Sequence, residues 1–171
     1  MFPLVTRAAW KARPPTSVTE LDARAIRHLV IHYSAANADE QSDHRNCARR
    51  VRAIQNYHMT ASPSDPTKPW SDIAYSWLFC KHGYIYRGRG IAAKSAATGP
   101  ANSYTVAACF LGDDTVCRDD VTPAGRGAIL EIRDFVERNA PNFQSVKCHR
   151  DFMQTTCPGD ELTRFVRALG T

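Results

Sequence analysis

The sequence predicts an α/β protein in which one mixed central β-sheet is flanked by helices. Two observations predict this fold class. Short apolar, β-branched runs interleave with segments whose apolar residues recur at helical spacing, a pattern typical of helices packed on a sheet. The chain has 171 residues, of which 43% are hydrophobic, and this is the size and composition of one ordinary globular domain. We therefore expect residues 1–171 to form a single domain.

The expected strands are short and apolar. Leu29–Tyr33 is rich in β-branched residues and predicts a buried strand. Ile73–Cys80 and Tyr84–Arg87 are joined by a link that contains glycine, which predicts a hairpin. Val106–Leu111 is a further apolar strand that ends at a Gly-Asp-Asp turn, and Ser145–Cys148 is a short one.

Helical spacing of apolar residues predicts helices over Asn46–Met59, Pro123–Arg138 and Asp160–Leu169. A proline suits the first turn of the second helix, because its missing N–H has no partner there. In the first helix we expect Ile54 and Tyr57 to lie on the buried face.

Prolines predict the conformation of the N-terminal arm and of one loop. Residues 1–20 contain an Arg-Pro-Pro sequence and predict an extended N-terminal arm packed on the surface of the domain. The prolines in Ser62–Pro69 exclude a helix there and predict a loop.

The chain is basic, with a net charge of +5, which suits either solubility or a polyanionic partner such as an anionic cell wall. The basic residues are scattered, so we expect no nucleic-acid partner. No apolar run of about 18 residues occurs, so we expect no membrane partner. The first residues lack the pattern of a signal peptide, so we expect synthesis in the cytoplasm. We also expect the protein to be a monomer.

The six cysteines contain no C-x-x-C pair, and the spacing does not determine which of them pair. Cys80 and Cys109 lie in apolar runs and are interpreted as buried thiols. The cysteines are Cys47, Cys80, Cys109, Cys117, Cys148 and Cys157.

Histidine and cysteine also supply candidate metal ligands. His28 and His32 would be about 13 Å apart along a strand, so at most one of them can ligate a given ion, and His32 lies at the end of its run. His149 and Cys157 are separated by a polar loop, and with one further imidazole they would form a three-ligand zinc site with a position left for water. Cys148 would point away from such a site, because neighbouring residues of an extended segment face opposite ways. A pair at this spacing is by itself a weak signal.

Several segments, in order along nearly the whole chain, carry a family resemblance. They are Val5–Pro15, Leu29–Ser34, Ile54–Met59, Trp70–Trp77, Tyr86–Gly90, His149–Asp151 and Thr155–Gly159. Together they resemble the type-2 N-acetylmuramoyl-L-alanine amidase family, which includes bacteriophage lytic amidases and animal peptidoglycan recognition proteins. The resemblance implies a mixed sheet with a few flanking helices, in agreement with the fold class predicted above.

The resemblance implies zinc bound by His32, His149 and Cys157. It also implies that Tyr75 is the catalytic tyrosine and that Thr155 is a second catalytic residue. Family members that bind without cleaving typically have serine at the position of Cys157, so this cysteine favours an enzyme. From the residues alone, the favoured interpretation of Tyr75 is a core aromatic of its strand, and Thr155 could be a loop hydroxyl that caps the last helix.

The resemblance further implies that His58, Trp70 and Asn102 bind the substrate. From the residues alone, His58 is a histidine on a helix face and Trp70 a buried aromatic. In the family, a Gly-Trp pair at this position is associated with diaminopimelate-type stem peptides. This chain has Pro69-Trp70, so only the tryptophan of the pair is matched.

The function implied by the resemblance is a zinc-dependent amidase that hydrolyses the bond between muramic acid and L-alanine of peptidoglycan. We expect a phage or prophage endolysin that acts on the cell wall after release. The alternatives are a cytosolic amidase that recycles muropeptides, a recognition module that binds peptidoglycan without cleaving it, and a basic nucleic-acid-binding domain with a structural zinc.

Overall fold

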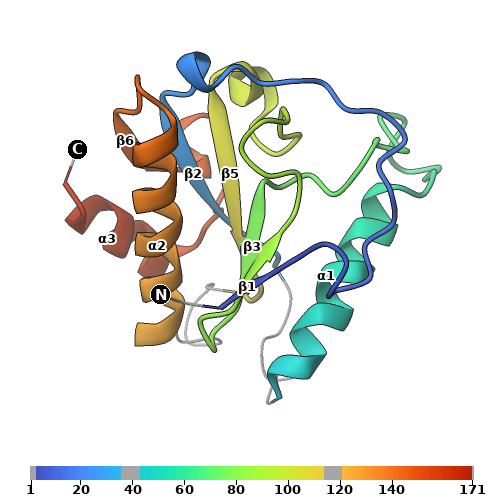
Figure 1. Ribbon diagram of the computed structural model, residues 1–171, viewed down its shortest axis with the longest axis horizontal. Helices are drawn as coiled ribbons and strands as arrows, with labels where there is room; N and C mark the ends of the chain where they lie inside the picture. Colours follow the sequence, from blue (N-terminus) through green and yellow to red (C-terminus); the bar gives the residue numbers. More distant parts are fainter. Residues whose placement is uncertain (1–2, 36–42, 114–120, 171) are drawn as a thin grey trace.

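The computed structural model describes residues 3–35, 43–113 and 121–170, and it has three layers with a mixed sheet in the middle (Figure 1). The strand order is β1-β4-β3-β5-β2-β6. β3 and β4 are antiparallel, and the other neighbouring pairs are parallel. The predicted fold class is therefore confirmed. The strands are β1 (Leu4–Val5), β2 (His28–Tyr33), β3 (Trp77–Phe79), β4 (Ile85–Arg87), β5 (Thr105–Phe110) and β6 (Ser145–Cys148).

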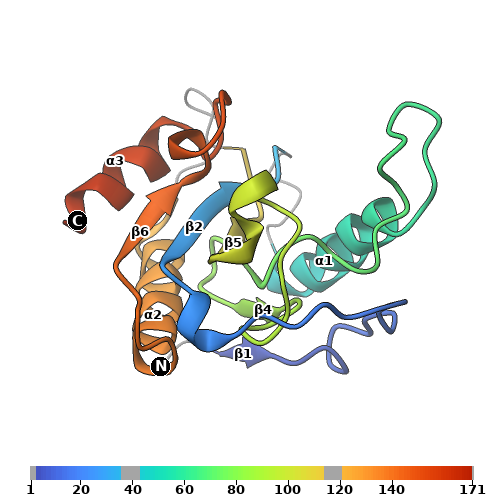
Figure 2. The same ribbon diagram turned by 90° about the horizontal axis from the view of Figure 1, so that it is seen from above.

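Helices cover both faces of the sheet, as the two perpendicular views show (Figures 1 and 2). α2 (Pro123–Asn139) and α3 (Asp160–Ala168) lie on one face, and α1 (His44–His58) lies on the other. Each lies within two residues of its predicted bounds. No helix in the described ranges is both long and apolar enough to cross a membrane. Short 3-10 turns occur at Ala23–Ala25, Gly99–Ser103 and His149–Asp151.

The side chains of each strand point alternately to the two faces of the sheet, and this divides the core into two clusters. Ile31, Ala108 and Phe79 belong to the cluster beneath α2 and α3. Leu78 and Cys109, one residue away in sequence from members of that cluster, belong to the cluster beneath α1. This separation is the expected consequence of side chains pointing alternately to the two faces of a sheet.

The buried face of α1 differs from the prediction. Tyr57 is 66% exposed, whereas Gln55 and His58 are buried. Gln55 can lie in the interior because its side-chain amide donates to Asp72 at 2.7 Å and both donates to and accepts from the backbone of Arg13. The prediction considered only the spacing of apolar residues along α1, so it did not identify Gln55 and His58 as buried. Hydrogen bonds to groups outside the helix make the burial of these polar side chains possible.

The strand predicted over Ile73–Cys80 is shorter than expected and covers only Trp77–Phe79. The preceding residues bond to several segments instead of one ladder. The backbone N–H of Ser76 donates to Ala107, while the carbonyl of Tyr75 accepts from Arg89. Tyr75 therefore lies just before β3 and not within it. The predicted hairpin is present, because β3 and β4 pair in antiparallel fashion.

The N-terminal arm contributes to the interior. Leu4–Val5 forms β1 beside β4, and Trp10 is fully buried, with its indole N–H donating to the carbonyl of Arg87 at 2.9 Å. Arg7 forms an ion pair with the buried Asp72 at 2.9 Å. The arm thus forms part of the cluster beneath α1.

None of the cysteines in the described part of the chain forms a disulfide, and all of them are buried. Cys80 and Cys109 are fully buried, as predicted. Cys117 lies outside the described residues.

Candidate metal centre and groove

His32 and His149 are brought together by the pairing of β2 with β6. These parallel strands place Ile31 opposite Cys148, so the residues that follow, His32 in β2 and His149 at the start of the 3-10 turn after β6, lie at the same edge of the sheet. Alternation along β2 turns the imidazole of His32 to the face of α1, and the 3-10 turn places the ring of His149 next to it, while Ile31 and Cys148 lie in the opposite core cluster. The predicted orientation of Cys148 is therefore confirmed. His28, at the start of β2, contacts Ser145 Oγ at 3.0 Å, far along the strand from His32.

Cys157 reaches the same place because the loop after β6 folds back. The backbone N–H of Arg150 donates to the carbonyl of Cys157 at 3.0 Å. The guanidinium of Arg150 also donates to the carbonyl of Thr156 and to Asp160 Oδ1. These bonds close the polar loop between His149 and Cys157. Gly159, at φ 94°, then starts α3 in a conformation that favours glycine.

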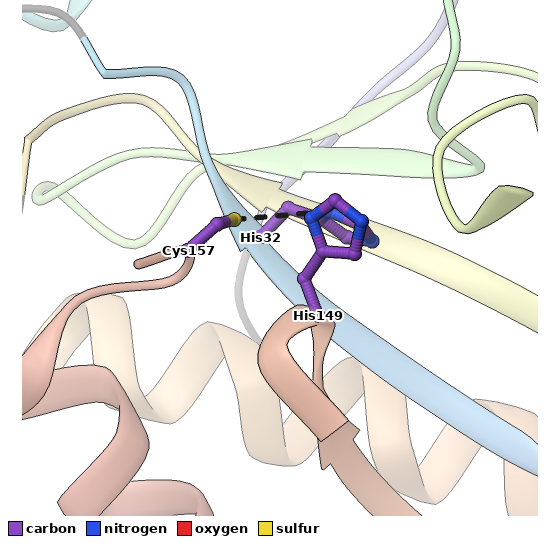
Figure 3. Close-up of side chains that lie close together, drawn as sticks. All are labelled: His32, His149 and Cys157. Atoms are coloured by element: carbon purple, nitrogen blue, oxygen red, sulfur yellow. Dashed lines mark hydrogen bonds between the residues drawn. The ribbon is translucent and has the colours of Figure 1, made fainter. Parts of the chain in front are cut away.

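The three side chains converge from different elements (Figure 3). One ligand atom from each of His32, His149 and Cys157 lies within 4.8 Å of the others. Cys157 Sγ is 3.9 Å from His32 Nδ1, and the two imidazole centroids are 4.4 Å apart. Ligand atoms of a tetrahedral zinc site lie about 3.3–3.8 Å apart. Small side-chain movements would therefore allow one ion to contact all three.

Burial sets the protonation of these groups. It lowers the pKa of His32 well below its usual value, with the nearby His149 adding to the effect, and it lowers the pKa of His149 as well. Both imidazoles are therefore neutral near pH 7, which is the form that ligates metals. Burial raises the pKa of the Cys157 thiol to about 12, so a metal has to displace its proton.

Thr98 orients His32, a contact that no motif or spacing in the sequence predicts. Its hydroxyl lies 3.3 Å from His32 Nε2, which leaves Nδ1 directed towards Cys157. Asn102 holds the loop that carries Thr98, because its side-chain oxygen accepts from the N–H groups of Ala97 and Thr98 and from Ser95 Oγ. Asn102 was predicted from the resemblance to bind substrate, and this oxygen is engaged within the chain.

Tyr75 lies beside the histidines. Its ring centroid is 5.5 Å from that of His32 and 5.9 Å from that of His58. Burial raises the pKa of Tyr75 well above its usual value, with Cys109 and Cys157 adding to the effect. The phenol therefore stays protonated at neutral pH and is a hydrogen-bond donor.

His58 and Trp70 form an aromatic wall next to Tyr75. Their centroids are 4.7 Å apart. His58 Nδ1 accepts from the N–H of Ala74 at 3.1 Å, so the imidazole is held in one orientation. Lys68, from the proline-rich loop, places its ammonium 3.0 Å from the ring centroid of Tyr57, a cation–π contact.

Thr155 does not cap α3, because Gly159 is the N-cap and no side chain caps that helix end. The hydroxyl of Thr155 instead accepts from the N–H of Cys157 at 3.2 Å. Thr155 therefore fixes the backbone that carries the thiol.

The donor set fits a zinc ion. Two neutral imidazoles and one cysteine, mostly buried and held by their own hydrogen bonds, are the ligand types that zinc prefers. Three protein ligands are the number found in catalytic zinc sites, where the fourth position is left for water or substrate.

The sequence has relatives that cover nearly its whole length, although it matches no protein-family model. It is 30% identical over 174 residues to peptidoglycan recognition protein 1 of Mus musculus, covering 96% of this chain and 86% of that protein. It is 28% identical over 168 residues to N-acetylmuramoyl-L-alanine amidase of Homo sapiens, covering 94% of this chain and 27% of that longer protein.

Solved structures share the fold. Drosophila peptidoglycan recognition protein SD superposes with a TM-score of 0.83 at 25% identity, covering 98% of this chain and 94% of that one. Peptidoglycan recognition protein LE in complex with tracheal cytotoxin, a monomeric diaminopimelic acid-type peptidoglycan, superposes with a TM-score of 0.78 at 23% identity, covering 96% and 92%. The second likeness is one of fold alone.

Proposed function

This chain belongs to the family of peptidoglycan recognition proteins and type-2 N-acetylmuramoyl-L-alanine amidases, and within that family we propose that it is a zinc-dependent amidase. The bond cleaved is the amide between muramic acid and the L-alanine of the stem peptide. One observation carries the proposal, namely the convergence of His32, His149 and Cys157 beside the phenol of Tyr75.

Zinc would be held by His32, His149 and Cys157, and when bound it supplies Lewis acidity to the scissile carbonyl and to water. The protein's own part is to keep both imidazoles neutral by burial and to fix the ring of His32 through Thr98. Thr155 acts in the same way on Cys157, by binding the N–H of that residue.

Tyr75 donates a hydrogen bond to the carbonyl oxygen as negative charge develops on it. The raised pKa keeps its proton in place at neutral pH. A donor of this kind strengthens in the transition state and is worth about 10² to 10³ in rate.

The wall formed by His58 and Trp70 is proposed to bind the muramyl peptide next to the bond that is cleaved. It adjoins Tyr75, since His58 contacts both rings. An aromatic and imidazole surface of this kind supplies apolar contact and a ring N–H donor.

The experiment is digestion of purified peptidoglycan with and without a chelator, followed by mass analysis of the soluble products. We expect free stem peptides with a new L-alanine N-terminus, lost on chelation and restored by Zn²⁺. Cys157→Ser should release none, because serine is a poor zinc ligand. Cys148→Ser, which alters a buried thiol of the opposite core cluster, is the matched control and should remain active.

A recognition module is the second candidate, and it is favoured by the names of the relatives, most of which are recognition proteins. It predicts that the wall binds the protein and is not cleaved at any zinc concentration. That result would overturn the amidase proposal.

We further propose the role of a phage or prophage endolysin, with the polymeric wall as substrate. The net charge of +5 supports this choice, because intact cell wall is anionic. Faster release of peptides from intact sacculi than from soluble muropeptides, at equal substrate concentration, is the expected result. The opposite preference would favour the recycling amidase.

A further inference from the structure

A second group of metal-ligating side chains lies outside the candidate centre. Cys47 comes from the first half of α1, Cys80 directly follows β3, and His82 lies in the loop between β3 and β4. One ligand atom of each lies within 4.8 Å of the others. His82 Nδ1 is 3.6 Å from Cys47 Sγ and 3.6 Å from Cys80 Sγ. None of these residues belongs to the site that contains His32.

The two groups are separated by a strand. Cys109 of β5 is paired with His32 of β2 on one side and with Leu78 of β3 on the other. Cys80 lies two residues beyond Leu78 and on the same face of the sheet. The group of Cys47, Cys80 and His82 therefore lies between α1 and the end of β3, whereas the group of His32, His149 and Cys157 lies beside β2 and β6.

We propose that Cys47, Cys80 and His82 form a second metal site, which binds Zn²⁺ and links α1 to the β3–β4 loop. The donor set has two sulfur atoms, one imidazole nitrogen and no carboxylate, and such sets select zinc over magnesium or calcium. With zinc–ligand bonds of about 2.3 and 2.05 Å, a sulfur and a nitrogen on one tetrahedral ion lie about 3.6 Å apart. The observed separations of 3.6 Å meet this requirement.

Burial distinguishes this group from a chance surface cluster. Cys47 and Cys80 are fully buried and lie in the core cluster beneath α1. An ion here is shielded from water on the sides formed by the core.

His44 is the candidate for the fourth ligand. It lies one turn before Cys47, and residues three apart share a helix face. Its ring is stacked on Tyr84, with centroids 4.6 Å apart, and its centroid is 6.4 Å from that of His82. Two imidazoles on one zinc have centroids about 5 Å apart, so a rotation of the exposed His44 side chain would complete the site.

Zinc counting on the full chain, kept reduced, tests the proposal. After saturation with Zn²⁺ and desalting, the wild type should hold two zinc ions per chain, and Cys157→Ser and His82→Gln should each hold one. His82→Gln keeps both thiols and alters a half-buried residue, so it should fold. Two zinc ions in wild type and in His82→Gln alike, or one in wild type and none in Cys157→Ser, would overturn the second site.

The Cys157→Ser background allows a spectroscopic test that does not use activity. Titration with Co²⁺ should produce thiolate-to-cobalt charge-transfer absorbance from two thiolates. Adding Cys80→Ser should abolish it, whereas adding Cys148→Ser, the control for loss of a buried thiol, should leave it unchanged. Since the first site is already disabled, failure of the amidase proposal cannot produce this result.

His44→Ala in the same background should weaken Co²⁺ binding at least tenfold. Unchanged affinity would overturn the assignment of His44 as fourth ligand.

A disulfide between Cys47 and Cys80 is the main competing arrangement. It would lower the protein mass by two hydrogen atoms, join the two cysteine peptides on digestion and prevent Co²⁺ binding until reduction. Finding this bond in protein purified under reducing conditions would overturn the proposal.

Discussion

At the residue scale, burial gives ordinary side chains the protonation states that the site requires. Tyr75 keeps its proton and His32 stays neutral, in both cases because the charged form would lie among protein atoms. Hydrogen bonds of His32 with Thr98, and of the Cys157 backbone N–H with the Thr155 hydroxyl, then fix the ligands. The chemistry of the site therefore depends on its enclosure as much as on the residues themselves.

Tyr75→Phe separates the phenol from the metal ligands. The variant should bind zinc as the wild type does, because Tyr75 is not a ligand, and kcat for amide hydrolysis should fall about 10²-fold. Steady-state kinetics with a muramyl peptide, together with zinc analysis, measures both. An unchanged kcat would mean that the oxyanion is stabilised by other groups.

His58 makes the free energy of unfolding depend on pH. Burial lowers its pKa to about 4, with the charges of Lys68 and Arg89 adding to the effect. The unfolded chain binds this proton near pH 6.5, so the contribution of His58 is complete above that pH and is lost as pH falls towards 4. The loss is about 3 kcal/mol.

His58→Gln should remove that dependence. Urea unfolding at pH 7 and pH 4 should show a stability loss about 3 kcal/mol smaller in the variant than in the wild type. Equal losses in both proteins would show that His58 titrates normally in the folded state.

At the element scale, strand register and the N-terminal arm decide the architecture around the site. The pairing of β2 with β6 places two histidines at one edge, and a shift of one residue would turn one of them into the opposite core. The arm supports α1 through Trp10 and through the Arg7–Asp72 ion pair. Gln55 joins these parts, because it binds both Asp72 and the arm at Arg13.

Trp10→Ala tests the structural role of the arm. It should lower the free energy of unfolding by about 3–5 kcal/mol, because it empties a fully buried site and frees the Arg87 carbonyl. Val18→Ala, at a residue 60% exposed in the same arm, is the control and should change stability by less than about 0.5 kcal/mol. Equal small effects in urea unfolding would show that the arm only lies on the surface.

At the scale of the whole molecule, the larger apolar cluster and the candidate metal sites lie on opposite faces of the sheet. The cluster beneath α2 and α3 contains most of the large apolar side chains, whereas both candidate metal sites lie on the face of α1. Figure 1 shows the strands between α1 on one side and α2 and α3 on the other.

Ile129→Ala should therefore affect stability and leave catalysis unchanged. Ile129 is a fully buried residue of α2 that packs against the sheet, and its truncation should cost about 2–5 kcal/mol in urea unfolding. The amidase rate should stay within twofold of the wild type at temperatures where both proteins are folded. A large fall in kcat would show that the two faces are coupled.

The sequence by itself determined the fold class, the order and approximate bounds of most elements, and the identity of His32, His149, Cys157 and Tyr75 as candidates. Hydrophobic period and residue type are local properties, so they can be read along the chain. The family resemblance, and not the spacing of these residues along the chain, assigned them to one site.

Only the tertiary structure decided which residues meet. It placed the ligand atoms within reach of one another and shortened the strand before Trp77. It also buried Gln55 and His58 while exposing Tyr57. The contact of Thr98 with His32, and the meeting of Cys47 with Cys80 and His82, join residues that are far apart in sequence or on different elements. Such contacts depend on how strands pair and helices pack, and no local pattern in the chain encodes them.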